Sequence, residues 1–327
     1  MRVFLSLIVI GALAAAGFAG AAWWEDRYFA QAGPATSEKT VIVKPGSGVA
    51  AIAQTLAEAG VVDNALLFRI AVIGRGSAGQ LKAGEYAFPA HASEAQVVAM
   101  LVVHKTLEHR LTIAEGLTSD AAVALVAADS VLTGPVTVAP EGSLLPETYL
   151  FERGTTRAEL LARMHQAQEK VLAELWPKRK EGLPLMSQED ALKLASIVEK
   201  ETAIASERPR IAAVFINRLK NSMKLESDPT IIYGLTKGVP LGHALRLSEL
   251  QIPNPYNTYQ IVGLPPTPIS NPGKQAIAAA LNPADTDELY FVADGSGGHA
   301  FAKTIADHQK NVAQWRKLEK DQAAASR

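Results

Sequence analysis

The chain has 327 residues, a length sufficient for about two domains. Hydrophobic residues make up 48% and charged residues 20%, which is ordinary globular usage and excludes a disordered or collagen-like chain. The 32 basic and 33 acidic side chains give a net charge of −1, so the chain lacks the basic excess of a dedicated nucleic-acid-binding protein. It has no cysteine, which excludes disulfides, thiolate nucleophiles and cysteine-ligated zinc.

The first segment is a long run without charge. Residues 3–24 contain no charged side chain and end in Trp23 and Trp24. As a helix rising about 1.5 Å per residue, this run would span roughly 33 Å, which is enough for a bilayer core of about 30 Å. Because Arg2 precedes the run, the positive-inside preference keeps the N-terminus in the cytoplasm and sends the remaining chain across the membrane. We therefore predict a retained transmembrane anchor over 1–26; a signal peptide cleaved near 19–21 is the alternative.

A small α+β module is predicted to follow the anchor. Residues 27–38 are small and polar, which is typical of a linker. The stretch 39–106 then shows period-two and helical spacing in turn. The pattern predicts a strand at 40–43, a helix that begins at Val49, a second helix at 64–74 and a strand at 84–88.

A second small strand-helix unit with a connecting loop is predicted over 107–146. A faint repeat at an offset of 70 residues aligns Val43 and Gly46 with Ile113 and Gly116. In both copies an extended run meets a glycine turn and then a helical pattern, so the two segments are interpreted as related units. Chance is the alternative explanation of so short a match.

The remaining residues, 147–327, are predicted to form a mainly helical domain with a few short strands, so the fold class is α+β. Ser206 is expected to cap one of its helices. In the last helix Ile305, Val312, Trp315 and Leu318 are expected to face inward. The predicted helices lie at 156–177, 187–204, 206–221, 273–281 and 304–320, and a strand at 289–293 precedes a glycine-rich turn at 295–298.

Two glutamates near the end of the 187–204 helix have different positions on a helical wheel. At roughly 100° per residue and with Leu194 at zero, Glu201 falls at about −20°, inside the apolar stripe. Glu199 falls near 140°, so it is predicted to be a solvated surface charge. A buried carboxyl group is paired with a cation or protonated more easily than a free one. The pattern leaves two interpretations of Glu201 open: a general acid, or a structural ion pair with Arg218 or Arg208.

Two later loops carry side chains suited to carbohydrate. Residues 225–230 are predicted to form a polar turn that directs side chains into a cleft. Residues 253–273 are rich in proline, which stiffens a loop at small entropic cost. Within them, tyrosine rings and asparagine amides offer stacking and hydrogen bonds to a sugar, as in Tyr256, Asn257 and Tyr259. A rigid structural loop with buried tyrosines is the alternative.

Six ordered motifs together resemble one family, the endolytic murein transglycosylases, also called MltG or YceG-like. The motifs are residues 195–202 (ASIVEKET), 214–219 (VFINRL), 227–234 (SDPTIIYG), 256–259 (YNTY), 263–266 (GLPP) and 290–292 (YFV). The resemblance extends from the anchor to the last helix, and it implies that the module between them is LysM-like. The chain departs from the family pattern at Glu226, where glutamine is expected, and at Thr267, where glycine is common.

The resemblance implies a single-pass protein of the bacterial inner membrane whose C-terminal body lies in the periplasm. Such a protein cuts nascent peptidoglycan strands internally, between N-acetylmuramic acid and N-acetylglucosamine, without water and with a 1,6-anhydro end, and so terminates strand elongation. It needs no metal or organic cofactor, and its expected partners are peptidoglycan strands and glycan polymerases of the penicillin-binding class.

The resemblance also places the family's catalytic glutamate on Glu201, as general acid and then base. We predict that Asp228, Tyr256, Asn257, Tyr259 and Glu226 bind the substrate. Two rival functions stay open: a muramidase-type hydrolase with Asp228 as base or nucleophile, and a membrane-anchored peptidoglycan-binding scaffold protein.

Overall fold

The computed structural model describes residues 26–325 without a gap, together with residues 10, 13, 15–17, 19–20 and 23. The predicted transmembrane anchor over 1–26 therefore lies largely outside the described residues. Within the part that is described, no helix has both the length and the apolar character that crossing a bilayer requires. The chain divides into an N-terminal unit, which runs up to His109 and includes Leu150–Gly154, and a C-terminal unit, formed by Arg110–Tyr149 and the residues from Thr155 onward.

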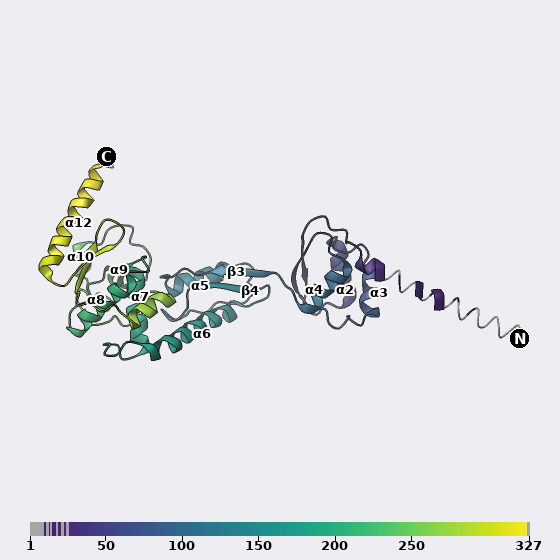
Figure 1. Cartoon of the computed structure of the whole chain (residues 1–327), viewed down its shortest axis with the longest axis horizontal. Coiled ribbons are helices and arrows are strands. Elements are labelled where there is room, and N and C mark those ends of the chain that lie inside the picture. Colours follow the sequence, from purple (N-terminus) through teal and green to yellow (C-terminus); the bar gives the residue numbers. More distant parts are fainter. Residues whose placement is uncertain are drawn as a thin grey trace. The chain divides into compact units, whose positions relative to one another are not determined.

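The N-terminal unit is a two-stranded sheet covered by helices (Figure 1). Strands β1 and β2 pair antiparallel, with Lys39 opposite Phe88 and Val43 opposite Gly84. The rings of Tyr86 and Phe88 stack in the core of this unit. The elements are β1 (Lys39–Val43), α2 (Val49–Glu58), α3 (Ala65–Gly74), β2 (Gly84–Phe88) and α4 (Glu94–Val103). The predicted order of strand, helix, helix and strand is confirmed, and α4 is an additional helix that begins at a capping box between Ser93 and Gln96.

Strands β3 (Glu108–Thr112) and β4 (Thr148–Glu152) pair with each other, and the division between the two units falls within both. After β3 the chain turns at Gly116, whose φ of +76° lies in the left-handed region, and enters α5 (Ser119–Ala128). This strand, glycine turn and helix match the repeat that the sequence indicates, since Gly46 has a φ of +79° between β1 and α2.

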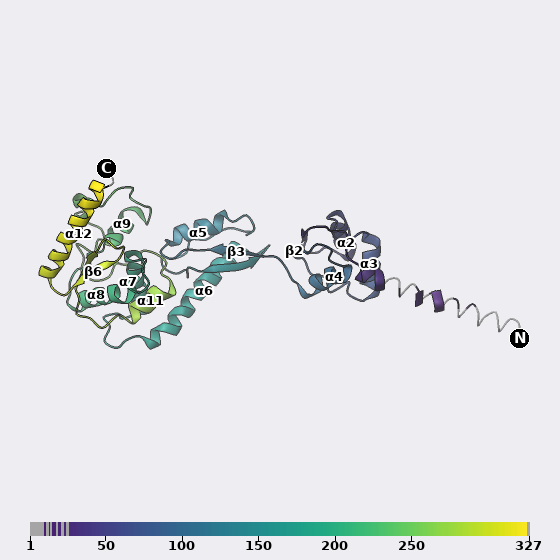
Figure 2. The same ribbon diagram turned by 45° about the horizontal axis from the view of Figure 1, so that its top comes forward.

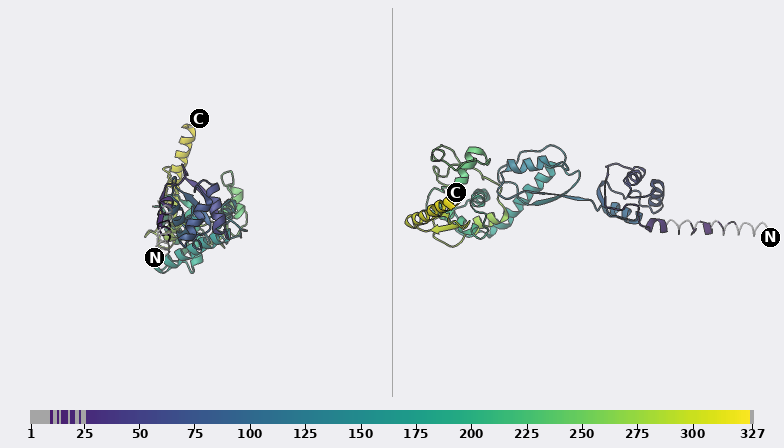
Figure 3. Two further views of the ribbon diagram at one scale, coloured as in Figure 1. Left: turned by 90° about the vertical axis from the view of Figure 1, so that its right-hand side faces the viewer. Right: turned by 90° about the horizontal axis from the view of Figure 1, so that it is seen from above.

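The C-terminal unit is mainly helical and is built around α7, which packs against α8, α9 and α11 (Figure 2). The antiparallel β5–β6 hairpin supports the last helix, α12 (Figure 3). The elements are α6 (Arg157–Leu175), η1 (Trp176–Lys178), α7 (Gln188–Glu201), α8 (Arg208–Lys220), α9 (Asp228–Thr236), α10 (Leu247–Leu250), α11 (Lys274–Leu281), β5 (Tyr290–Ala293), β6 (His299–Ala302) and α12 (Ile305–Ala325). The prediction of a mainly helical α+β domain with short strands is confirmed.

Three local predictions in this unit are wrong. Residues 225–230 are a turn only in their first half, because α9 already begins at Asp228, with Pro229 in its first turn. Ser206 caps nothing: the N-cap of α8 is Glu207, which makes no side-chain capping bond. In α12, Ile305 and Leu318 are exposed, because the helix rests on a hairpin too small to cover its whole apolar stripe.

Candidate active site

Glu201 is the last residue of α7, where the backbone turns to an extended conformation at Thr202. The helix buries the preceding apolar residues, among them Ile197 and Val198, and this anchors its C-terminal turn in the core. The Glu201 side chain is half-buried, and its Oε1 accepts a hydrogen bond of 2.5 Å from the Ser227 hydroxyl. The carboxyl group therefore faces the segment that leads into α9.

The pKa of Glu201 is raised to about 7. The largest cause is burial, which disfavours the charged form, and the negative charge of Asp228 adds to it. The hydrogen bond from Ser227 and the positive charge of Arg218 act in the opposite direction and only partly offset the increase. A carboxyl group with this pKa both gives and takes a proton readily near neutral pH.

Ser227 was not predicted as a site residue, although it opens one of the family motifs. It is buried, and its backbone N–H donates to Thr258 Oγ1 at 2.9 Å. The Thr230 hydroxyl donates to the Ser227 carbonyl at 2.6 Å and lies 2.8 Å from Thr258 Oγ1. This buried network fixes the hydroxyl that contacts Glu201. The signal in the sequence was the Ser-Asp-Pro-Thr motif, which places Ser227 immediately before the helix.

Asp228 and Tyr259 lie together near Glu201. The Tyr259 hydroxyl donates to Asp228 Oδ1 at 2.8 Å. Burial raises the pKa of Tyr259, and the negative charges of Asp228, Glu226 and Glu201 raise it further, so all three carboxyl groups are within electrostatic range of this phenol. Two of the predicted substrate-binding residues, Asp228 and Tyr259, therefore share the surroundings of Glu201.

The two arginines that a structural ion pair would need are engaged elsewhere. Arg218 donates to Glu226 Oε2 at 3.0 Å and to the carbonyl oxygens of Leu225 and Leu289 at 2.9 and 2.7 Å. Arg208 pairs with Glu199 at 2.9 Å. Among the salt bridges of residues 26–325, none includes Glu201. The geometry thus favours the acid over the ion pair, and it places Glu226 as a partner of Arg218.

Glu199 is not the solvated charge that the wheel predicts. Its side chain is only 4% exposed and lies between Arg208 and the backbone N–H of Gly273, which donates to Oε2 at 2.9 Å. The wheel assumed a single buried face, whereas the segment before α11 and the start of α8 cover α7 on a second face. Ser196, which shares this face, is fully buried and accepts a hydrogen bond from the Ile269 N–H.

Tyr256 and Asn257 stabilise their own loop. The Tyr256 hydroxyl lies 2.9 Å from Thr267 Oγ1, and its ring meets Tyr233 edge to face. Asn257 is fully buried, and its amide donates to the carbonyl oxygens of Leu250 and Ile252. With both amide hydrogens used in this way, Asn257 has no donor left for a sugar.

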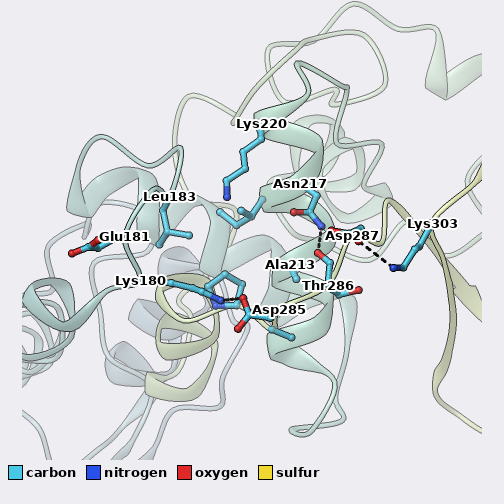
Figure 4. Close-up of a pocket in the computed structure, with 13 residues that line it drawn as sticks. Lys180, Glu181, Leu183, Ala213, Asn217, Lys220, Asp285, Thr286, Asp287 and Lys303 are labelled. Carbon is cyan, nitrogen blue, oxygen red and sulfur yellow. Dashed lines mark hydrogen bonds and ion pairs between the residues drawn. The ribbon is translucent and has the colours of Figure 1, made fainter.

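A cavity of about 290 Å³ adjoins Glu201. It is lined by Glu201, Thr202, Ala203, Ala293, Gly295, Gly297, Gly298, His299, Trp315 and Gln322. A larger cavity of about 460 Å³ lies elsewhere on this unit, and two of its lysines pair with aspartates, Lys180 with Asp285 and Lys303 with Asp287 (Figure 4). The smaller cavity is the candidate active site because Glu201 lines it.

No cluster of histidine, aspartate or glutamate side chains in the described part of the chain has the composition to hold a metal ion.

The chain belongs to the YceG-like family, whose sequence model matches residues 41–314. The resemblance found in the motifs is thereby confirmed. The chain is 38% identical to an endolytic murein transglycosylase of Bacillus subtilis over 172 residues, which cover 52% of this chain and 46% of that protein. It is 30% identical to an endolytic murein transglycosylase of Streptococcus pneumoniae over 357 aligned positions, which cover 94% of this chain and 64% of that protein.

A YceG-like protein of Listeria monocytogenes, known from a crystal structure, is 31% identical to this chain and superposes with a TM-score of 0.50. The match covers 84% of this chain and 99% of that one. The chain spans between about half and two thirds of the length of the curated relatives that it matches.

Proposed function

We propose that this protein is an endolytic murein transglycosylase that cleaves the bond between N-acetylmuramic acid and N-acetylglucosamine without water. The proposal rests on the surroundings of Glu201. Its half-buried carboxyl group has a pKa raised to about 7 and accepts a hydrogen bond from the Ser227 hydroxyl. It has no salt bridge to an arginine among the described residues, and Glu201 lines a cavity. Relatives of this chain in the same family bear the name of this activity.

The reaction requires one carboxyl group that acts twice. Protonated Glu201 donates its proton to the glycosidic oxygen while the bond from that oxygen to the muramyl anomeric carbon breaks. The resulting carboxylate then takes the proton of the muramyl C6 hydroxyl as its oxygen bonds to the same carbon. The product is a 1,6-anhydro ring, and Glu201 is protonated again. A pKa near the working pH suits both steps.

The role of Asp228 separates this reaction from a muramidase-type hydrolysis, in which Asp228 would act as base or nucleophile. Ordinary glycosidases use a second carboxylate as base or nucleophile. Here Asp228 accepts a hydrogen bond from Tyr259, which ties its oxygen to the loop that follows α10. We assign Asp228, Tyr259 and Glu226 to positioning the substrate and the Ser227 segment.

The same proposal includes the location of the enzyme and the role of its N-terminal segments. Residues 1–26 anchor it in the inner membrane with the body in the periplasm, as the uncharged run at 3–24 and the preceding Arg2 favour. Residues 39–106 form a LysM-like module that binds peptidoglycan, a reading that the strand, helix, helix and strand order supports. The protein works beside glycan polymerases of the penicillin-binding class and terminates strand elongation.

The proposal is tested with purified protein and uncross-linked glycan strands whose length is followed over time. Glu201→Gln is expected to reduce strand cutting by about a thousandfold or more, because the proton donor is lost while the shape is kept. Glu189→Gln is the matched control, since Glu189 lies on the same helix with an exposed side chain, and it should cut as the wild type does. Full activity of Glu201→Gln would contradict the assignment, and a wild type that binds strands without cutting them would favour the scaffold protein.

A further inference from the structure

The cavity beside Glu201 is built from three segments that are far apart in the sequence. The end of α7 and the two residues after it contribute Glu201 to Ala203, and α12 contributes Trp315 and Gln322. The β5–β6 hairpin contributes Ala293, His299 and the glycines of its turn. Only the first of these segments overlaps the motif that contains Glu201. The role of the other two in the site does not follow from that motif.

Trp315 has the largest side chain among the residues that line the cavity. It is half-buried, and the β5–β6 turn packs against it. A Cβ atom at Gly295 would lie 3.6 Å from Trp315 Cζ3 and 3.1 Å from Leu318 Cδ1, so this close approach suits glycine. Gly295 also has a φ of +86°, which favours glycine independently. The turn thus holds the indole in place at the wall of the cavity.

The same turn is fixed to the segment that follows Glu201. The Glu207 carboxylate accepts the backbone N–H of His299 at 3.0 Å and lies 2.8 Å from His299 Nδ1. The Thr202 hydroxyl donates to this carboxylate at 3.3 Å. A side chain at Gly298 would collide with it, because a Cβ there would be 2.7 Å from Glu207 Oε1. The wall that holds Trp315 is therefore kept at a set position relative to the acid.

The chemistry of the cavity suits a sugar ring. Its volume of about 290 Å³ is at the small end of ligand pockets. The glycines and alanines of the lining leave room for a ring, the indole offers a flat apolar face, and Gln322 offers amide hydrogen bonds. We propose that this cavity is a saccharide subsite in which Trp315 stacks on the sugar next to the bond that Glu201 protonates. This inference rests on the proposed function.

The test is a binding measurement in the Glu201→Gln background, so that no strand is cut. The probe is soluble, uncross-linked glycan of N-acetylglucosamine and N-acetylmuramic acid without stem peptides. The chain has four tryptophans, and replacing one at a time assigns the change in fluorescence on binding. With Trp315→Phe the change should disappear, and with the matched control Trp176→Phe it should persist.

Affinity is measured in parallel. Trp315→Ala should weaken binding by roughly tenfold, and Trp315→Phe, which keeps a smaller ring, by less. Ala203→Leu, which puts a larger side chain into the cavity from the α7 end, should also weaken it. Unchanged affinity and fluorescence in the Trp315 variants, or no binding by the Glu201→Gln parent, would overturn the subsite. Cutting by the wild type is scored separately, so failure of the subsite is distinguishable from failure of the proposed function.

Discussion

Two glutamates, one in each unit, have a pKa raised to about 7, and burial is the largest cause for both. Glu94, in the first turn of α4, is 6% exposed, and its Oε2 has no hydrogen-bond partner among the described residues. Glu201 instead accepts a hydrogen bond from the Ser227 hydroxyl and lines a cavity. A raised pKa by itself therefore reports burial, and what distinguishes Glu201 from Glu94 is the hydroxyl partner and the cavity beside it.

The largest expected effect separates these two residues by activity. Glu201→Gln should lower kcat by about a thousandfold or more, whereas Glu94→Gln should change it less than about twofold, since the Glu94 side chain is buried in the N-terminal unit and does not belong to the Glu201 site. Initial rates of strand shortening measure both. Equal losses of activity in the two variants would contradict the assignment of Glu201 as the catalytic acid.

The second effect concerns the two glutamates of α7. Glu199→Gln removes the countercharge nearest to the buried Arg208 guanidinium, so it should lower the free energy of unfolding by about 3 kcal/mol. Urea denaturation at neutral pH measures this, with Glu189→Gln as the exposed control. A value near zero would mean that Glu115, the other acid beside Arg208, balances this charge alone.

The third effect is the pH dependence of stability. Because the folded-state pKa of Glu94 is raised, the folded chain keeps a proton that the unfolded chain has released. The associated stability is present at acidic pH and is lost as the pH rises to about 7. Glu94→Gln should remove this loss and be more stable than the wild type at about pH 8, by on the order of 2 kcal/mol. Thermal unfolding at acidic and alkaline pH, compared with Glu189→Gln, measures it, and an unchanged slope would contradict burial as the cause.

The smallest effect is a shift in the pH dependence of catalysis when the hydrogen bond to Glu201 is removed. The Ser227 hydroxyl stabilises the carboxylate and so lowers its pKa. Ser227→Ala should therefore move the alkaline limb of kcat/KM, where the acid loses its proton, upward by about half a pH unit. Wild-type kcat/KM should fall above about pH 7 with a single ionisation. A shift to lower pH in the variant would contradict the assigned hydrogen bond.

The helices with clear amphipathic spacing were predictable. In α6 and α7 both the apolar period and a capping residue, Thr156 or Ser187, are visible in the sequence. Helix α4 was missed because its own sequence is apolar on nearly all sides of the helix, so it shows no helical period of apolar and polar residues. The start of α9 was missed because Asp228-Pro229 is also typical of a turn.

The site was predictable at Glu201 and less so around it. Periodicity distinguished Glu201 from its neighbours, but it placed Glu199 in water because a wheel contains no information about a second covering segment. Ser227 and Trp315 were missed as site residues because their importance arises from contacts between distant segments, which local spacing does not encode.

The isotope content of the product shows whether water takes part in the cut. Glycan strands are cut by the wild type in water enriched in heavy oxygen, and the new ends are analysed by mass spectrometry. If Glu201 acts twice on one muramyl residue, each cut leaves one anhydro muramyl end and one N-acetylglucosamine end, and neither carries heavy oxygen. New ends that carry heavy oxygen on a free reducing sugar would mean that water is the nucleophile and that Glu201 is not the single acid and base.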